Sequence, residues 1–122
     1  MKRLSNLPPA SVCRGLVLAV TMMASTVSWS ETDFPRMLEA ARHGDDMARV
    51  VIAYSYLWGE YRDGTPVEKD LDLAYAWASL ANFQGNERAQ SVLDRVIPQL
   101  EDRERADALA VELHERYDAR SR

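Results

Sequence analysis

The chain has 122 residues, of which 47% are hydrophobic and 28% are charged, and its formal net charge is −4. This length favours one small domain, and the apolar content is too high for an intrinsically disordered chain. The acidic balance argues against binding to nucleic acid, because carboxylates repel the phosphate backbone. After residue 30 the sequence is rich in Ala, Leu, Glu and Arg and lacks period-two runs of Val, Ile and Thr. We therefore expect an all-α fold.

The first 30 residues have the order of a secretory signal peptide. Lys2 and Arg3 give a positive start, the apolar run 16–27 follows, and Ser28 and Ser30 provide small residues at its end. This order predicts cleavage after Ser30. The apolar run is shorter than the roughly 20 residues that a membrane-spanning helix needs. The alternative is that the segment stays uncut as a short anchor.

Cleavage leaves residues 31–122 as one domain, which we expect in the periplasm or outside the cell. The signal holds three basic and no acidic residues, so its removal changes the net charge from −4 to −7. Cys13, the single cysteine, is lost with the signal. The mature domain therefore has no disulfide and no thiolate site, and we expect no membrane span after cleavage.

Apolar residues at three- and four-residue steps predict five helices in the mature domain. Asp45 and Asn86 are predicted to cap two of them, and Asp70 is predicted to start another. Gly44 and Gly85 end the preceding helices, and a loop covers 59–67. The predicted helical ranges are 34–43, 46–59, 70–84, 86–98 and 102–117.

An internal similarity relates the first and third of these helices. Gly44 and Gly85 are 41 residues apart, and each has an alanine four positions before it and another four positions after it. The small residues allow two helices to approach closely, and the glycine allows a sharp turn between them. A repeat of this period is typical of stacked helical hairpins.

On these residues the chain resembles the Sel-like repeat family, which is related to the tetratricopeptide repeats. The resemblance covers residues 38–93, with one full repeat at about 48–85, and its loop is longer than usual, with Gly64 displaced by the insertion. It implies a short right-handed α-solenoid capped by residues 102–118. The matching positions are Ala48, Ile52, Ala53, Tyr56, Gly59, Val67, Asp70, Ala74, Trp77, Ala81 and Gly85.

The resemblance implies an exported scaffold for protein–protein interaction. Exported bacterial members are associated with envelope assembly, polysaccharide export, motility or host contact. The sequence does not identify the protein partner. Two other classes stay open: an accessory envelope enzyme with weak hydrolase activity, and a structural module that associates with itself as a homo-oligomer.

Signals for catalysis or metal binding are weak in this sequence. His43 lies beside two aspartates, but acidic residues at this place also favour the start of the next helix. His114 has glutamates nearby that do not share its helical face, and Asp63-Gly64 lacks the set of oxygen ligands of an EF-hand loop. Ser79 and Ser91 have no histidine at a useful spacing. We expect no catalytic residue, no cofactor and no metal site.

Aromatic residues give the strongest candidates for binding. Trp77 is predicted to fill the core, whereas Val50, Tyr54 and Leu57 lie on the side of the helix 46–59 opposite Ile52. A helix that is apolar on both sides is either packed between neighbours or offers a binding surface, and both interpretations stay open here. Trp58 and Tyr61 open the long loop. We predict Tyr54, Trp58 and Tyr61 as anchors for a partner.

Overall fold

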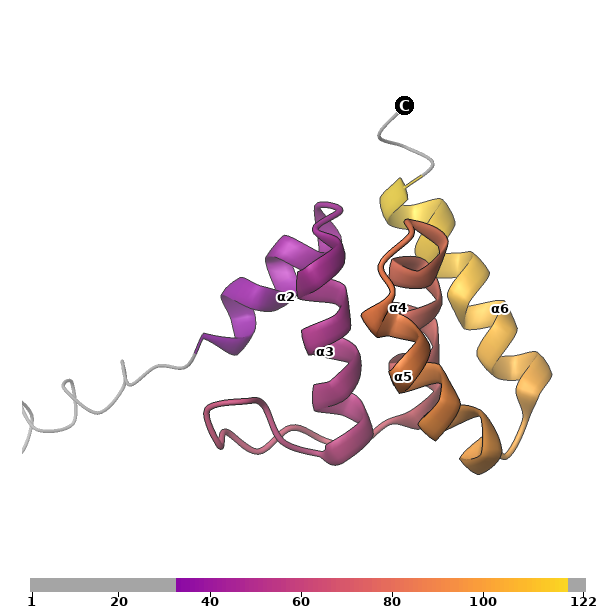
Figure 1. Cartoon of the computed structure of the whole chain (residues 1–122), viewed down its shortest axis with the longest axis horizontal. Coiled ribbons are helices and arrows are strands. Elements are labelled where there is room, and N and C mark those ends of the chain that lie inside the picture. Colours follow the sequence, from indigo (N-terminus) through magenta and orange to yellow (C-terminus); the bar gives the residue numbers. More distant parts are fainter. Residues whose placement is uncertain (1–32, 119–122) are drawn as a thin grey trace, which may run out of the picture. The chain divides into compact units, whose positions relative to one another are not determined.

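The computed structural model describes residues 33–118, and within this range the chain is helical (Figure 1). One isolated β-bridge joins Glu60 to Pro66 in the long loop. The all-α prediction is confirmed, whereas the signal peptide and its cleavage site lie outside the described residues. The helices are α2 (Phe34–Arg42), α3 (Asp46–Trp58), α4 (Leu71–Phe83), α5 (Arg88–Val96) and α6 (Arg103–Leu113), with a 3-10 turn η2 (Ile97–Gln99) and a π-helical turn η3 (His114–Asp118).

The helix ends follow from side chains that satisfy free backbone groups. The Asp45 carboxylate accepts a hydrogen bond from the Ala48 N–H at 2.9 Å, and Asp70 accepts one from Leu73 at 3.0 Å. Such caps stabilise a helix by about 1 kcal/mol each. Gly59 ends α3 with a φ of 78°, a conformation that other residues adopt at a cost. These starts and this stop agree with the sequence prediction.

The start of α5 differs from the prediction. Asn86 does not occupy the capping position, because α5 begins two residues later, at Arg88. The Asn86 Oδ1 atom instead accepts a hydrogen bond from the Arg88 N–H at 2.8 Å, and its Nδ2 atom donates to Asp46 at 3.0 Å. Asn86 thus connects the turn before α5 to the start of α3.

Helix α4 is the centre of the structure. It packs against α3, α5 and α6, and α2 packs against the outer side of α3 (Figure 1). Alanines on several faces of α4 allow three helices to come close to it, and Trp77, 3% exposed, fills the space among them. The predicted core position of Trp77 is confirmed. The buried residues of α4 are Ala74, Tyr75, Ala76, Trp77, Ala78, Leu80 and Ala81.

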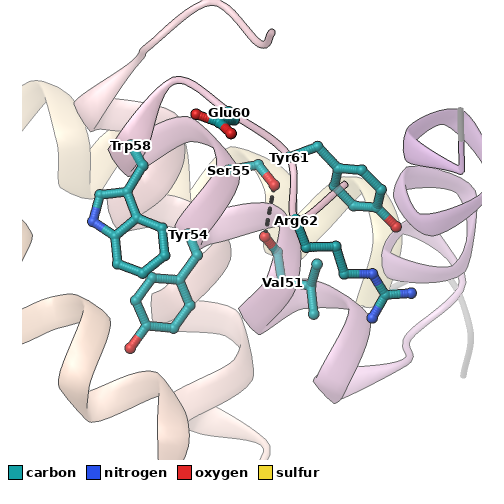
Figure 2. Close-up of a pocket in the computed structure, with 7 residues that line it drawn as sticks. All are labelled: Val51, Tyr54, Ser55, Trp58, Glu60, Tyr61 and Arg62. Carbon is teal, nitrogen blue, oxygen red and sulfur yellow. Dashed lines mark hydrogen bonds between the residues drawn. The ribbon is translucent and has the colours of Figure 1, made fainter. Parts of the chain in front are cut away.

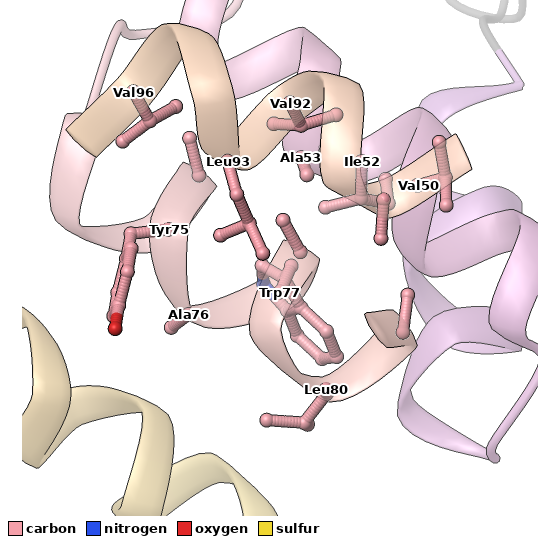
Figure 3. Close-up of a cluster of buried hydrophobic side chains, with 14 of the residues drawn as sticks. Val50, Ile52, Ala53, Tyr75, Ala76, Trp77, Leu80, Val92, Leu93 and Val96 are labelled. Carbon is pink, nitrogen blue, oxygen red and sulfur yellow. The ribbon is translucent and has the colours of Figure 1, made fainter. Parts of the chain in front are cut away.

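The core joins α3, α4 and α5. Figure 3 shows Leu93 of α5 beside Trp77 and Val92 beside Ala53 and Ile52 of α3, and Val96 belongs to the same buried cluster. Burying a large aliphatic side chain stabilises a fold by about 1.5–3 kcal/mol. This cluster therefore packs α3 against α4 and α5.

A buried arginine ties α3 to distant parts of the chain. Arg49 is fully buried, and its Nε donates to the Ala41 carbonyl at 2.9 Å. Its guanidinium also donates to Gln84 at 2.9 Å and to both Asp118 oxygens, at 2.5 and 3.1 Å. Arg49 lies 5.8 Å from the Trp77 ring centroid. One side chain therefore connects the end of α2, the end of α4 and η3.

Asp118 is the counter-charge to Arg49. Partial burial raises the pKa of this carboxyl group, but hydrogen bonds and charge attraction from Arg49 and His114 outweigh burial and hold its pKa below the usual value of 3.8. His114 contributes through its Nδ1 atom, 3.3 Å from Asp118. Next to it, Tyr117 stacks on Trp77 with ring centroids 5.7 Å apart. The last turn thus closes over the end of the core.

Candidate protein-binding groove

Helix α3 has a second, open face. Met47, Val51, Tyr54 and Trp58 follow one another at steps of four, three and four residues, so they form a stripe along one side of the helix. Met47 is 41% and Trp58 61% exposed, and the two residues between them are half-buried. An amphipathic helix normally turns such residues inward. This stripe lies away from Arg49 and Ile52, although the half-buried Tyr54 also packs against the edge of the core.

A hollow of about 470 Å³ lies at the C-terminal half of this stripe. We call it the aromatic hollow. Figure 2 shows the Tyr54 and Trp58 rings together on one side and Arg62 with Val51 on the other. The hollow is lined by Val51, Tyr54, Ser55, Trp58, Glu60, Tyr61 and Arg62.

A second hollow, of about 440 Å³, lies between α2 and the N-terminal half of α3. We call it the methionine hollow. Val51 and Arg62 line both hollows, so the two adjoin, and together they form what we call the α3 groove. The methionine hollow is lined by Asp33, Arg36, Met37, Ala40, Asp45, Met47, Ala48, Val51 and Arg62.

Tyr54 and Trp58 form the aromatic wall of the groove. Their ring centroids are 4.6 Å apart and the planes are tilted by 32°. Ring pairs of this kind stiffen both side chains, which reduces the entropy lost on binding. The structure therefore brings together two of the three aromatic residues that the sequence singles out.

The structure corrects the prediction for Tyr61, the third aromatic residue expected to anchor a partner. Its side chain is 1% exposed, so it does not offer its ring as a free anchor. The loop folds back through a hydrogen bond from the Tyr61 N–H to the Thr65 carbonyl at 2.8 Å, which turns the ring inward. There it meets Phe34 edge to face at 5.5 Å. Tyr61 forms part of the floor of the aromatic hollow.

Two other residues of α3 settle the open question about its second side. Val50 and Leu57 are each 3% exposed, so they belong to the core. The buried part of α3 is therefore wider than the spacing alone indicates. What stays open is the narrow stripe from Met47 to Trp58.

The loop beside the groove is held by its own hydrogen bonds. The Asp63 carboxylate accepts a hydrogen bond from the Thr65 N–H at 2.9 Å. Hydrogen bonds with the side chain and backbone of Thr65 hold the pKa of Asp63 below its usual range. The Gly64 N–H donates to the Tyr61 carbonyl at 2.8 Å. The Val67 N–H donates to Gly59 at 3.0 Å. The loop is thus a defined wall of the groove.

Five charged side chains line the groove: Asp33, Asp45 and Glu60 are acidic, and Arg36 and Arg62 are basic. Arg36 forms an exposed ion pair with Asp33 at 3.2 Å. Arg62 lies 5.5 Å over the Tyr61 ring. Within residues 33–118 no carboxylate forms an ion pair with Arg62, although this cation stands where the two hollows meet.

The two histidines weighed for chemistry lie apart from the groove. His43 bonds to the Glu39 carbonyl at 2.9 Å, and His114 lies beside Asp118 at 3.3 Å. In the part of the chain that the structure describes, no three His, Cys, Asp or Glu side chains gather as metal ligands. Over the same residues, no helix is both long and apolar enough to cross a membrane.

A second exposed apolar patch lies between α4 and α6. Phe83 is 79% and Val111 56% exposed, and the Phe83 ring meets His114 edge to face at 5.6 Å. The hollow beside them measures about 240 Å³. This patch is smaller than the α3 groove and lacks its aromatic pair, so Phe83 serves below as a comparison site.

Sequence reasoning missed Arg49 and Arg62. Arg49 precedes Ile52 and Ala53 by three and four positions, so its helical face is the buried one, and this spacing was a usable signal. The charge of Arg49 instead predicts an exposed position, because arginine is rarely fully buried. No pattern marks Arg62, whose position depends on how the loop folds.

Over residues 33–118 the chain is a small all-helical protein with an open apolar groove along α3. No family model matches the chain, and no curated protein or solved structure matches it.

Proposed function

We propose that this chain is an exported protein-binding module of the Sel-like repeat type, which holds a protein partner in the α3 groove and catalyses no reaction. The open stripe of α3 carries the proposal. Large apolar side chains gathered in a hollow are typical of interaction sites, whereas single exposed ones are common on any surface. Tyr54 and Trp58, the two aromatic residues of the stripe, belong to the types that most often anchor interfaces.

The order of helix contacts supports the repeat interpretation. Helices α3 and α4 run in opposite directions and form a hairpin, α5 packs against both, and α6 packs against α4 (Figure 1). Stacked hairpins make contacts of this order. We propose a short right-handed solenoid, with one full repeat at about 48–85 and residues 102–118 as its cap.

The residues shared with the family have roles that fit this interpretation. The glycines at 59 and 85 end helices with φ values of 78° and 97°, and Asp70 caps α4. Tyr56, half-buried, meets Phe34 of α2 edge to face at 6.2 Å. The small residues at helix contacts, together with the large ones in the core, are buried: Ala48, Ile52, Ala53, Ala74, Trp77 and Ala81.

Export is part of the proposal. The signal-like order of residues 1–30 supports cleavage after Ser30 and a place in the periplasm or outside the cell. Intact-mass measurement on protein from the envelope fraction tests this, with Glu31 expected as the new N-terminus. A full-length mass in the membrane pellet would contradict cleavage.

Site-specific photocrosslinking in the producing cells tests the binding function. We replace Trp58 with a photoreactive aromatic residue in one variant and Phe83 in a control. Both side chains are highly exposed, so both variants should fold. We expect discrete adducts from position 58 that weaken when Tyr54→Ala is added, and no such adducts from position 83.

Self-association is the competing outcome. Adducts from position 58 at twice the chain mass would assign the groove to a second copy, and sedimentation of the purified protein would then show a dimer. Equal adduct patterns from positions 58 and 83 would show that the α3 groove is not a specific site.

A further inference from the structure

The spacing of the open stripe indicates what shape fits it. Met47, Val51, Tyr54 and Trp58 alternate steps of four and three residues, which is the heptad pattern of a seam between two helices. Eleven residues of α3 separate its ends, a length of about 16 Å at about 1.5 Å per residue. A partner helix of about three turns covers this length.

The opposite wall of the groove also presents a helical face. Arg36, Met37 and Ala40 follow one another on α2 at steps of one and three residues and line the methionine hollow. Ala40 and Ala48 leave room at the floor, because their side chains end at Cβ. The occupant would thus contact two helices at once, as an amphipathic helix does in a hydrophobic groove.

Two other peptide shapes fit the groove poorly. A β-strand needs free backbone groups along an edge, but α2 and α3 use theirs internally, and the loop pairs Tyr61 with Thr65 and Val67 with Gly59. A proline-rich peptide needs separated aromatic ridges, but the Tyr54 and Trp58 rings lean on each other at 4.6 Å. A helix is the shape that these walls accept.

Charge sets a second requirement. Arg62 borders both hollows, and within residues 33–118 its guanidinium makes no ion pair. A helix that covers the stripe takes this cation partly out of water. Such desolvation is unfavourable unless the partner brings a carboxylate to it. Arg36 does not pose this requirement, because Asp33 already pairs with it at 3.2 Å.

We propose that the α3 groove binds an amphipathic helix of a partner protein, with large apolar side chains at heptad spacing against Met47–Trp58 and with an acidic side chain against Arg62. This inference rests on the proposed function and specifies its ligand. The helical walls and the position of Arg62, which lines both hollows whereas Glu60 lines the aromatic hollow alone, select the ligand class. A second copy of the chain is the alternative occupant.

The test uses two synthetic helical peptides of about 15 residues, a length at which alanine-rich sequences begin to hold a helix. Both carry Leu at heptad positions, and they differ at one central flank position, Glu in one and Lys in the other. We expect the Glu peptide to bind the purified protein at least about tenfold more tightly than the Lys peptide in fluorescence anisotropy. Arg62→Glu should reverse this preference.

Control variants isolate the charge effect. Arg36→Glu should change the preference much less than Arg62→Glu, and Trp58→Ala should weaken both peptides. A third peptide with two central prolines should not bind. Arg62 is exposed, and circular dichroism checks that each variant keeps its fold.

Three results would overturn the inference. Equal binding of the Glu and Lys peptides would refute the acidic requirement, and equal binding of the proline peptide would refute the helix. A stable dimer that Trp58→Ala dissociates would assign the groove to a second copy. The first two results leave the proposed function intact, because crosslinking from position 58 tests partner binding without assuming the shape or charge of the ligand.

Discussion

Trp77 and Trp58 belong to two regions of the molecule that use the same side chain in opposite ways. Trp77 is 3% exposed at the centre of α4, whereas Trp58 is 61% exposed at the end of α3. The core around Trp77 is closed by α3, α5 and α6 and by Tyr117. The groove around Trp58 has walls but no cover. We therefore expect the core around Trp77 to determine stability and the groove around Trp58 to bind a partner.

Truncation of Trp77 should destabilise the protein more than any change in the groove. Trp77→Ala removes the main side chain among three helices, and truncating a large buried aromatic residue costs about 3–5 kcal/mol. In a small domain this is a large part of the free energy of unfolding, so we expect substantial unfolding. Thermal melting followed by circular dichroism measures it, and Trp58→Ala is the matched control. Equal melting temperatures for the two variants would contradict the contrast.

The buried ion pair is the next test of the core. Asp118→Ala leaves the Arg49 guanidinium fully buried without its counter-charge, and we expect a loss of about 3 kcal/mol, the lower end for breaking a buried pair. Because the Asp118 side chain is 20% exposed, we expect the loss of stability at the lower end of that range. Glu112→Ala removes an exposed partner of Arg116 and should cost little. A similar loss in both variants, measured by chemical denaturation, would refute the role of the buried pair.

The same pair predicts a pH dependence. The folded-state pKa of Asp118 lies below its usual value of 3.8, so its contribution to stability is present above that pH and is lost as the pH falls below it. We expect the wild-type melting temperature to fall with acidification below pH 3.8 more steeply than that of Asp118→Asn. Parallel curves would show that Asp118 does not titrate with folding.

A smaller effect is expected at the floor of the groove. The Tyr61 hydroxyl is buried, and within the described residues it has no hydrogen-bond partner. An unsatisfied buried hydroxyl is unfavourable, so Tyr61→Phe should leave stability unchanged or raise it by up to about 1 kcal/mol. A drop in melting temperature would mean that the hydroxyl makes a hydrogen bond that supports the fold.

Local patterns predicted most of the fold. The caps at Asp45 and Asp70, the stop at Gly59 and the buried Trp77 each depend on a few neighbouring residues, so the sequence is enough to infer them. Arg49 was missed because its burial requires partners from α2, α4 and η3, which only the folded chain brings together. Composition alone does not reveal such a contact.

The groove was predictable only in part. Tyr54 and Trp58 stand out because they share a helical side, but the position of Tyr61 depends on main-chain hydrogen bonds inside the loop. Its neighbour Arg62 points into the groove for the same reason. Side-chain type and spacing identify a helix face, whereas the walls beside it depend on how an irregular segment folds.

The double variant Tyr54→Ala with Trp58→Ala is the decisive test of the α3 groove, because both residues line it and neither is fully buried. Its melting temperature and its binding of the Glu peptide are measured on the same preparation. We predict that binding is lost, whereas the melting temperature falls far less than in Trp77→Ala, because Tyr54 only borders the core and Trp58 is exposed. A large fall in melting temperature would show that the two rings hold the fold together, and unchanged binding would show that the partner does not use the α3 groove.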